Sequence, residues 1–133
     1  MRRVVTFGTF DLFHIGHLNI LRRARALGDW LSVGISTDEL NMSKKGISPV
    51  HPFEERTAIV AALRYVDEVF AEHSLEQKRG YLLATQANVL VMGDDWAGRF
   101  DEFSDIVEVI YLPRTPEIST THIKRFIHSL EVS

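Results

Sequence analysis

The chain of 133 residues lacks several features that define common classes of protein. It has no cysteine, which excludes disulfides, thiolate metal sites and a cysteine nucleophile. It has no run of about 18 apolar residues, so we expect no transmembrane helix and no membrane insertion. Charge of neither sign dominates, because the formal net charge is -3. That balance gives no general attraction to nucleic acid, and we expect no nucleic-acid partner.

Several motifs of nucleotide enzymes are also missing. The sequence has no Walker A segment, and no Gly-x-Gly-x-x-Gly follows the first predicted strand. A P-loop kinase and a dinucleotide dehydrogenase are therefore disfavoured. A Gly-x-Ser-x-Gly nucleophile elbow does not occur either.

The composition that is present is typical of a globular protein. Hydrophobic residues make up 45% of the chain and charged residues 25%. The length suits one domain with a core of ordinary size, so we expect a single domain over residues 1–133. The stretch before Gly8 is too short for a signal peptide, and we expect a cytoplasmic protein.

Apolar patterns along the chain predict strands that alternate with helices. Short apolar, β-branched runs indicate strands, and apolar residues at helical spacing indicate helices. The predicted strands are 4–7, 30–36, 66–70, 89–92 and 107–112, the predicted helices are 15–27, 53–63, 75–85 and 118–130, and 41–52 is predicted to be a loop. This alternation indicates an α/β fold with a Rossmann-like, doubly wound, five-stranded parallel sheet.

Polar segments follow the first, fourth and fifth predicted strands. They cover residues 9–17, 93–96 and 114–121. Ligands of such sheets bind at the carboxyl ends of the strands, where the strand order reverses. If the first and fourth strands are neighbours, the three segments converge on one crevice.

His14 and His17 lie at the start of the first predicted helix, with Gly16 between them. Residues three apart share a helix face, so both imidazoles can point the same way. Gly16 lets a ligand approach the backbone, and the free N–H groups of a helix N-terminus attract phosphate oxygens. At this point a phosphate site, a two-histidine metal site and a pair without a role all remain open.

The segment 114–121 has the residues of a second phosphate site. Ser119 and Thr120 are good N-cap residues before the last predicted helix, and Arg114 can pair with a phosphate charge. A plain capping sequence with a surface arginine is the alternative.

Four basic residues are further candidates. Lys44 and Lys45 lie in the predicted loop, where a lysine could fold over a polyphosphate and neutralise transition-state charge. Arg56 and Arg64 lie on or just after the second predicted helix, as phosphate clamps or as surface residues. A solvated basic loop is the alternative for the lysines.

Three carboxylates follow predicted strands. Asp94 could bind ribose hydroxyls, a base amino group or hydrated Mg²⁺. Asp11 could hold Mg²⁺, orient a neighbouring group or fix its own loop. Asp38 lies after the second predicted strand, where a ribose partner is plausible.

The segments 9–11 and 14–17, Thr-Phe-Asp and His-Ile-Gly-His, resemble the signature of the nucleotidyltransferase α/β-phosphodiesterase superfamily. The segment 114–121 resembles the second signature of that superfamily. Five blocks, at 8–12, 35–39, 64–69, 91–96 and 111–121, are similar to the glycerol-3-phosphate cytidylyltransferase family. The resemblance spans nearly the whole chain, and its last two blocks are the most specific.

The resemblance implies transfer of CMP from CTP to sn-glycerol 3-phosphate, with CDP-glycerol and pyrophosphate as products and no covalent enzyme intermediate. It also implies Mg²⁺ bound mainly through the nucleotide phosphates, a homodimer, and a product used for teichoic acid or capsule polymers. The same chemistry is kept in three alternatives, an FAD-synthetase-like adenylyltransferase, an ethanolamine-phosphate cytidylyltransferase and a sugar-phosphate nucleotidyltransferase. A nucleotide-binding regulatory module without catalysis is an alternative of another class.

The resemblance also implies a role for each matching residue. The implied catalytic residues are His14, His17 and one of Lys44 and Lys45. The implied nucleotide contacts are Thr9, Phe10, His14, His17, Asp94, Arg114, Thr115, Ser119 and Thr120. The implied substrate contacts are Lys44, Lys45, Arg56, Arg64 and Asp67. No protein ligand for a metal is implied with them, although Asp11 is a possible one.

The chain departs from the family pattern in one loop and at one further position. The loop after Lys45 contains Gly46, Pro49 and His51, which leaves open which lysine is catalytic. Leu75 stands where the family pattern has an aromatic residue. If that position shapes the acceptor pocket, the acceptor differs, so the resemblance defines the nucleotide better than the acceptor.

Overall fold

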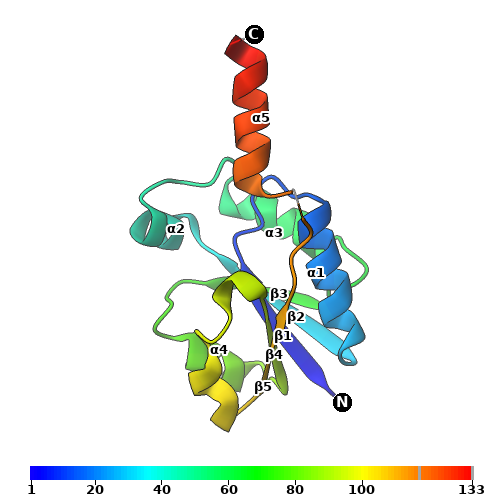
Figure 1. Cartoon of the computed structure of the whole chain (residues 1–133). Coiled ribbons are helices and arrows are strands. Elements are labelled where there is room, and N and C mark those ends of the chain that lie inside the picture. The colour runs from blue at the N-terminus through cyan, green and yellow to red at the C-terminus, as the bar shows by residue number, and fades with distance from the viewer. Residues whose placement is uncertain (117, 133) are drawn as a thin grey trace.

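Five parallel strands form the centre of this computed structural model, which describes residues 1–116 and 118–132 (Figure 1). The strands are β1 (Arg3–Gly8), β2 (Trp30–Ser36), β3 (Glu68–Glu72), β4 (Val89–Gly93) and β5 (Glu108–Leu112). Their order in the sheet is β3-β2-β1-β4-β5, and each neighbouring pair is parallel. The predicted Rossmann-like α/β fold is therefore confirmed.

The central strand β1 is apolar on both faces. Val4 and Val5 are fully buried, and they point to opposite faces of the sheet because side chains alternate along a strand. Val4 packs in one core cluster with Leu21, and Val5 packs in the other with Leu82. The sheet therefore separates two hydrophobic cores, as expected for a parallel sheet covered on both sides.

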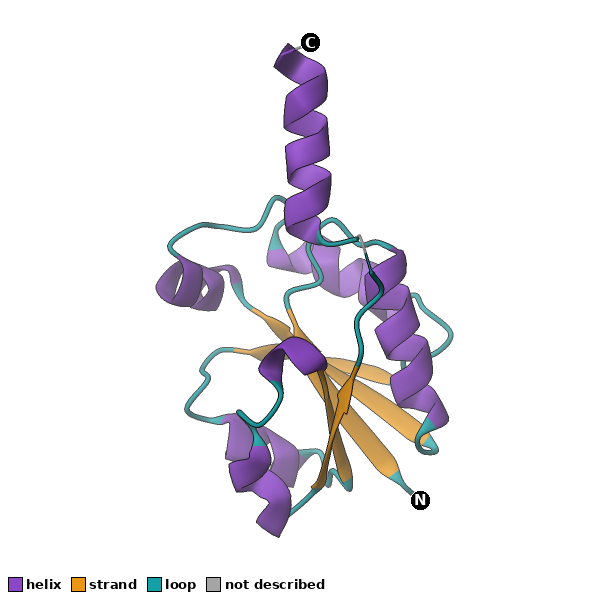
Figure 2. Ribbon diagram, viewed as in Figure 1, coloured by secondary structure: helices purple, strands orange, loops and turns teal. Residues whose placement is uncertain are grey.

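Helices cover each face of the sheet (Figure 2). α1 (Ile15–Ala26) and α3 (Phe53–Ala61) lie on the side of Val4. α4 (Lys78–Ala84) and the short 3-10 helix η2 (Asp101–Asp105) lie on the side of Val5. A second 3-10 helix, η1 (Asp94–Trp96), follows β4 directly.

The strand order reverses at β1, which pairs with β2 on one side and with β4 on the other. The condition for a common crevice is therefore met. The polar segments after β1, β4 and β5 all leave the same edge of the sheet, at the carboxyl ends of the strands.

The prediction of a loop over 41–52 is wrong in its first part, because a helix α2 (Asp38–Lys45) occupies it. The hydroxyl of Thr37 caps this helix by accepting a hydrogen bond from the N–H of Leu40 at 3.1 Å. Gly46 ends the helix with φ of 75°, a left-handed conformation that suits glycine. β3 also begins two residues later than predicted, and α4 begins three residues later than predicted.

The last helix, α5 (Thr120–Val132), extends away from the sheet (Figures 1 and 2). Its first turn lies at the carboxyl edge of the strands, and its far end is the C-terminal end of the described chain. No helix in the described ranges is long and apolar enough to cross a membrane.

Candidate active site

His14 and His17 form a reciprocal cap at the start of α1. Nδ1 of His14 accepts a hydrogen bond from the N–H of Gly16 at 3.0 Å, and Nδ1 of His17 accepts one from the N–H of His14 at 3.2 Å. The two rings are stacked with their centroids 3.8 Å apart. The cap therefore holds both imidazoles on one side of the helix, as their spacing indicates.

The same hydrogen bonds assign the ring protons. Because both Nδ1 atoms are acceptors, each neutral ring carries its proton on Nε2. Burial lowers the pKa of His14. Burial and then the neighbouring His14 lower the pKa of His17 to about 3, although the carboxylate of Asp11 opposes the shift. Both rings are therefore neutral near pH 7, and each has an Nε2–H donor for a phosphate oxygen.

The loop between β1 and α1 packs against the ring of His17 through Phe10. Phe10 and Leu12 have φ of 55° and 48°, in the left-handed region that is strained for residues other than glycine. The buried ring of Phe10 meets the ring of His17 edge-on, with centroids 5.4 Å apart. A Cβ atom at Gly8 would lie 2.7 Å from the Phe10 ring, so this position needs glycine. The side chain of Phe10 therefore packs against His17, and the predicted nucleotide contact of Phe10 would have to use its backbone.

Asp11 anchors a second loop to the first. Its Oδ2 accepts a hydrogen bond from the N–H of Val50 at 2.7 Å, and its Oδ1 accepts one from the N–H of His51 at 2.9 Å. Both carboxylate oxygens are therefore engaged by the backbone, which favours the loop-fixing role over a metal ligand. The described residues contain no group of three or more His, Asp or Glu side chains that could hold a metal ion.

The first turn of α5 lies against the same loop. The hydroxyl of Thr120 donates to the carbonyl oxygen of Asp11 at 2.8 Å, and Oγ of Ser119 accepts from the N–H of His122 at 3.0 Å. A Cβ atom at Gly16 would lie 3.4 Å from Cγ2 of Ile118. The starts of α1 and α5 therefore face each other, and two helix N-termini converge on one place.

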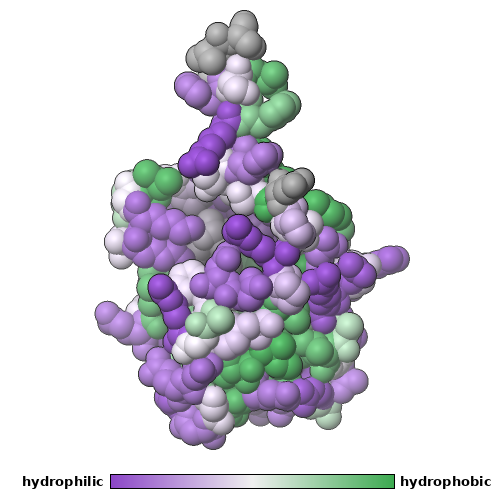
Figure 3. Space-filling view, viewed as in Figure 1, coloured by the Kyte–Doolittle hydropathy of each residue, from purple (hydrophilic) through white to green (hydrophobic). Residues whose placement is uncertain are grey.

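A cavity of about 220 Å³ opens at the start of α5. Its lining residues are Arg114, Ile118, Ser119, Thr121, His122 and Arg125. Two arginines, hydroxyls and helix N–H groups are the donors that bind phosphate. Figure 3 shows hydrophilic side chains gathered around the base of α5. Arg125 was not predicted, because no motif in the sequence marks its position on the last helix. Glu117, which belongs to the predicted segment 114–121, lies outside the described residues.

The segments after β4 and β5 are joined at the crevice. Nη1 of Arg114 lies 3.3 Å from Oδ2 of Asp95, and both side chains are exposed. The hydroxyl of Thr115 accepts a hydrogen bond from the amide of Asn19 on α1 at 2.9 Å. Asp94 opens η1 at the end of β4 and is exposed. Asp94, Arg114 and Thr115 are therefore available along one edge of the crevice.

Lys44 and Lys45 lie in the last turn of α2 and not in a loop. Desolvation lowers the pKa of Lys44, and the carboxylate of Glu72 opposes this shift. α2 begins directly after β2, so this helix leaves the carboxyl edge of the sheet. We take Lys44, whose ammonium is desolvated, as the candidate catalytic lysine.

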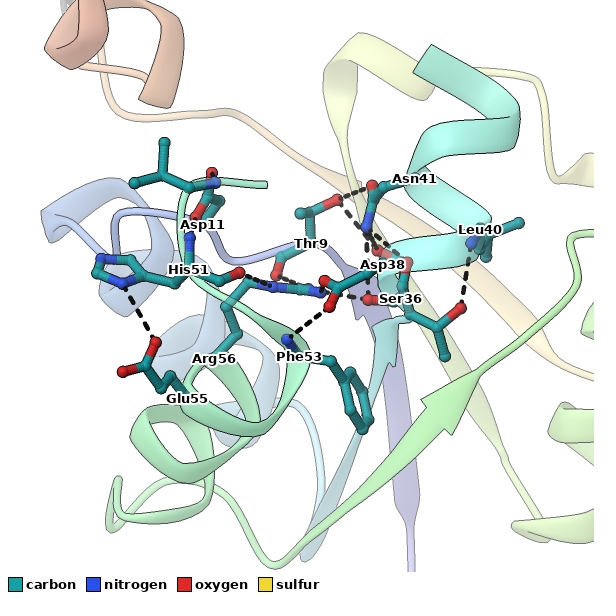
Figure 4. A network of polar contacts seen from close by, with 12 residues as sticks. Thr9, Asp11, Ser36, Asp38, Leu40, Asn41, His51, Phe53, Glu55 and Arg56 are labelled. Carbon is teal, nitrogen blue, oxygen red and sulfur yellow. Dashed lines mark hydrogen bonds and ion pairs between the residues drawn. The ribbon is translucent and has the colours of Figure 1, made fainter. Parts of the chain in front are cut away.

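Arg56 is engaged within the protein, and its predicted contact with a phosphate or the substrate stays a prediction. Its side chain is fully buried. Its guanidinium donates to the carbonyl oxygens of Thr9 and Ser36, each at 2.8 Å, and pairs with Asp38 at 2.7 Å (Figure 4). A third carbonyl, that of His51, accepts from Nε at 2.9 Å. Arg56 thus ties together β1, β2 and the loop before α3.

Asn41 completes this network and was not among the predicted residues. Its buried side-chain amide donates to Oγ of Ser36 at 2.9 Å and to the carbonyl of Thr37 at 3.0 Å. Its Oδ1 accepts from the hydroxyl of Thr9 at 3.0 Å (Figure 4). The hydroxyl of Thr9 is therefore engaged within the protein, so the expected nucleotide contact of Thr9 would have to use its remaining bonding capacity.

Arg64 and Asp67 lie at the amino edge of the sheet, opposite the crevice, and their contact with the substrate stays a prediction. Oδ2 of Asp67 accepts from the N–H of Leu31 at 2.8 Å and lies 3.2 Å from Nε of Arg25. Leu31 is near the amino end of β2, and Arg64 precedes the amino end of β3. The predicted parallel strand 66–70 is consistent with this position, because residues at the start of a parallel strand lie at the amino edge of the sheet.

Comparison with known proteins agrees with this geometry. Residues 5–126 match the family model described as cytidylyltransferase-like. The chain is 51% identical over 130 residues to a glycerol-3-phosphate cytidylyltransferase of Bacillus subtilis (strain 168), covering 98% of this chain and 100% of the relative. It is 47% identical over 128 residues to a protein of the same name from Staphylococcus aureus (strain NCTC 8325 / PS 47), covering 96% of each.

A solved structure shows the same fold. It is titled as a lipopolysaccharide core biosynthesis protein from Thermoplasma volcanium GSS1, and it superposes with a TM-score of 0.77 at 24% identity. The match covers 86% of this chain and 98% of that one. From the match to its family model and from its two bacterial relatives, the chain belongs to the cytidylyltransferase-like family.

Proposed function

We propose that this protein is a glycerol-3-phosphate cytidylyltransferase, which transfers CMP from CTP to sn-glycerol 3-phosphate and forms CDP-glycerol and pyrophosphate. One observation carries the proposal. The chain is 51% identical along its length to an enzyme of that name, and it brings two donor sets, the histidine pair and the start of α5, to one crevice.

The chemistry matches the donors in the crevice. An oxygen of the acceptor phosphate attacks the α-phosphorus of CTP in line, and pyrophosphate leaves on the opposite side. The attacking oxygen is already anionic, so the protein supplies positioning and charge stabilisation and not a strong base. The Nε2–H groups of His14 and His17 donate to nucleotide phosphate oxygens, and Lys44 neutralises charge that grows in the transition state.

The start of α5 suits the leaving pyrophosphate. Ser119, Arg114 and Arg125 line the cavity there, and the helix N-terminus adds N–H donors. The hydroxyl of Thr120 donates a hydrogen bond to the carbonyl oxygen of Asp11, so Thr120 contributes by fixing the first turn of α5 and not by binding phosphate with its side chain. The β- and γ-phosphates of CTP would therefore lie between α1 and α5.

We propose that Mg²⁺ enters with the nucleotide, as the Mg–CTP complex. The carboxylate oxygens of Asp11 accept hydrogen bonds from two backbone N–H groups, and the described residues form no cluster suited to the ion. The side chains of this protein are thus a poor fit for a resident ion. Turnover measured against free Mg²⁺ at fixed CTP should follow the concentration of the complex.

The choice of nucleotide separates the proposal from an adenylyltransferase. Calorimetric titration of the protein with CTP and with ATP, each with Mg²⁺, tests it. We expect CTP to bind at least tenfold more tightly. Tighter binding of ATP would favour the FAD-synthetase-like alternative, and CTP binding without turnover on any phosphorylated alcohol would favour a regulatory module.

We further propose a cytoplasmic homodimer whose product supplies teichoic acid or capsule polymers. The proposal extends the family resemblance, since a nucleotide-activated glycerol phosphate is a donor for polymer synthesis. Sedimentation equilibrium tests the assembly, with a mass of twice 15.2 kDa expected.

A further inference from the structure

Lys124 lies in the second turn of α5 and faces the loop between β1 and α1. Its Nζ is 3.9 Å from Oδ2 of Asp11, and its side chain is 38% exposed. Thr120, one turn earlier on the same helix face, donates a hydrogen bond to the carbonyl oxygen of Asp11 at 2.8 Å. Two residues of α5 therefore reach the same residue of the loop, and that loop continues directly into the histidine pair.

The pair of Lys124 with Asp11 is not needed to hold α5 in place. The carboxylate of Asp11 already accepts hydrogen bonds from the N–H groups of Val50 and His51, and the bond from Thr120 fixes the helix. A separation of 3.9 Å is too long for a hydrogen bond, and a partly exposed ion pair contributes little to stability. Within the described part of the chain, the Lys124 ammonium thus makes no hydrogen bond and is available to a ligand.

The first two turns of α5 present a hydroxyl and a cation on each of two faces. Thr121 and Arg125, which are four residues apart, line the cavity beside Arg114. Thr120 and Lys124, also four residues apart, face Asp11. Residues 118–130 include no carboxylate, so neither cation is neutralised from within this part of the helix. A chain of phosphates at the start of α5 would therefore meet a cation on either side.

The Lys124 ammonium lies beside the place where α1 and α5 converge. Asp11 comes three residues before His14, the N-cap of α1, and a Cβ atom at Gly16 would lie 3.4 Å from Cγ2 of Ile118 just before α5. The flexible four-carbon stem of a lysine can move its charge between neighbouring anions. A phosphate oxygen is a better partner than a carboxylate at 3.9 Å, because it can accept a short, charge-assisted hydrogen bond.

We propose that Lys124 is a further nucleotide-binding residue, whose ammonium leaves Asp11 and binds an oxygen of the β- or γ-phosphate when CTP enters. The inference rests on the proposed function and deepens it. Asp11 stays engaged after the exchange, because its carboxylate keeps the hydrogen bonds from Val50 and His51. Lys124 then holds the leaving pyrophosphate from the side of the Asp11 loop, and Arg125 holds it from the side of the cavity.

Calorimetric titration with CTP and with CMP, each with Mg²⁺, tests the proposal, because CMP lacks the β- and γ-phosphates. The titrations use wild-type protein, Lys124→Met, which removes the charge and keeps most of the stem, and Lys124→Arg, which keeps the charge. Arg2→Ala is the matched control, since it removes an exposed ion pair with Glu108 at the amino edge of the sheet. Circular dichroism and urea unfolding check that each variant is folded.

We expect Lys124→Met to raise the Kd of CTP about tenfold and to change the Kd of CMP less than about twofold. Lys124→Arg should keep the Kd of CTP within about threefold of wild type, and Arg2→Ala should leave both affinities unchanged. An unchanged CTP affinity in Lys124→Met, or an equal loss for CTP and CMP, would overturn the proposal. A raised KM for sn-glycerol 3-phosphate at unchanged CTP affinity would also overturn it, since the contact would then be to the acceptor.

A double-mutant cycle separates direct contact from an effect through Asp11. Lys124→Met is also made in the Asp11→Asn chain, where the ion pair is already absent, and direct contact predicts about the same tenfold loss of CTP affinity there. A further loss of less than about twofold would overturn the proposal, because Lys124 would then act only by holding α5 to the loop. If Asp11→Asn does not fold, the ³¹P resonances of bound CTP decide. The β- or γ-phosphate resonance should differ between wild type and Lys124→Met, and identical resonances would overturn the proposal.

Failure of the proposed function gives a different result. If wild-type protein binds CTP but forms no CDP-glycerol, the assigned reaction is wrong, and the affinities for CTP and CMP still decide the role of Lys124. If it binds another nucleoside triphosphate in place of CTP, that nucleotide is compared with its own monophosphate in the same variants. If it binds no nucleoside triphosphate, the proposed function and the role of Lys124 are both overturned.

Discussion

We propose that His17 serves in this crevice as a neutral hydrogen-bond donor. Its Nδ1 accepts from the backbone of His14, which leaves the proton on Nε2, and its pKa is lowered to about 3. A neutral donor keeps its state over the whole range of physiological pH, and its geometry is set by the helix cap. The sequence spacing predicted that the two rings share a face, but it could not predict the tautomer, which depends on the cap hydrogen bonds.

The first prediction at this scale concerns His17 itself. His17→Ala should lower kcat by on the order of 10²-fold, because a preorganised donor to the reacting phosphate is lost. The measurement is the rate of pyrophosphate release at saturating CTP. His128→Ala, an exposed histidine far along α5, is the matched control and should retain full activity. An unchanged kcat in folded His17→Ala protein would rule out this role.

The lowered pKa of His17 also predicts a dependence of stability on pH. Between pH 6.5 and 3 the unfolded chain binds a proton at His17 that the folded chain does not, so stability falls as pH falls. From pH 7 to pH 5 this contribution is about 2 kcal/mol of unfolding free energy. Urea unfolding of wild-type and His17→Asn protein at both pH values measures it. The loss should be smaller in the variant, and an identical loss would contradict the shift.

Lys44 and Lys45 give a matched pair of variants. Lys44→Ala should lower kcat about 10²-fold, because we assign its desolvated ammonium to the charge of the transition state, whereas Lys45→Ala should change kcat less than about threefold. Steady-state kinetics on both purified variants provides the comparison. A severe loss in Lys45→Ala with a mild one in Lys44→Ala would reverse the assignment.

At the scale of secondary structure, α2 shows where sequence patterns are insufficient. The segment contains Gly46 and Pro49 and is too short for a clear helical period, so the pattern predicts a loop. The cap by Thr37 and the left-handed turn at Gly46 nevertheless make eight residues helical. The buried strands were predictable because they are continuous apolar runs, and the long helices α1 and α5 because their apolar spacing extends over 12 and 13 residues.

The buried hydrogen bonds of Arg56 lead to a prediction about stability. Arg56→Ala should lower the unfolding free energy by about 3 kcal/mol or more, because it leaves buried carbonyl oxygens and Asp38 without their partner. Arg64→Ala, an exposed arginine just after α3, should change it by less than about 0.5 kcal/mol. Urea denaturation of the two variants decides the point. Equal stability of both would contradict the buried network.

At the scale of the whole molecule, the topology brings the two signatures together. The reversal of strand order at β1 predicted a crevice, and pairing of β1 with β4 places the segments after β1, β4 and β5 at one edge. The position of Asp67 at the opposite edge follows from the predicted parallel strand 66–70, which begins beside it. The projection of α5 could not be predicted, since its amphipathic pattern does not say where the helix points.

The most direct test of the central claim identifies the product. Purified protein with Mg²⁺ is given each of CTP, ATP, GTP and UTP together with sn-glycerol 3-phosphate, phosphoethanolamine or a sugar phosphate, and the products are identified by mass spectrometry. We expect CDP-glycerol and pyrophosphate in equal amounts from CTP and sn-glycerol 3-phosphate, at a rate at least tenfold above any other pair. Efficient use of ATP, or a preferred acceptor other than sn-glycerol 3-phosphate, would contradict the proposed function.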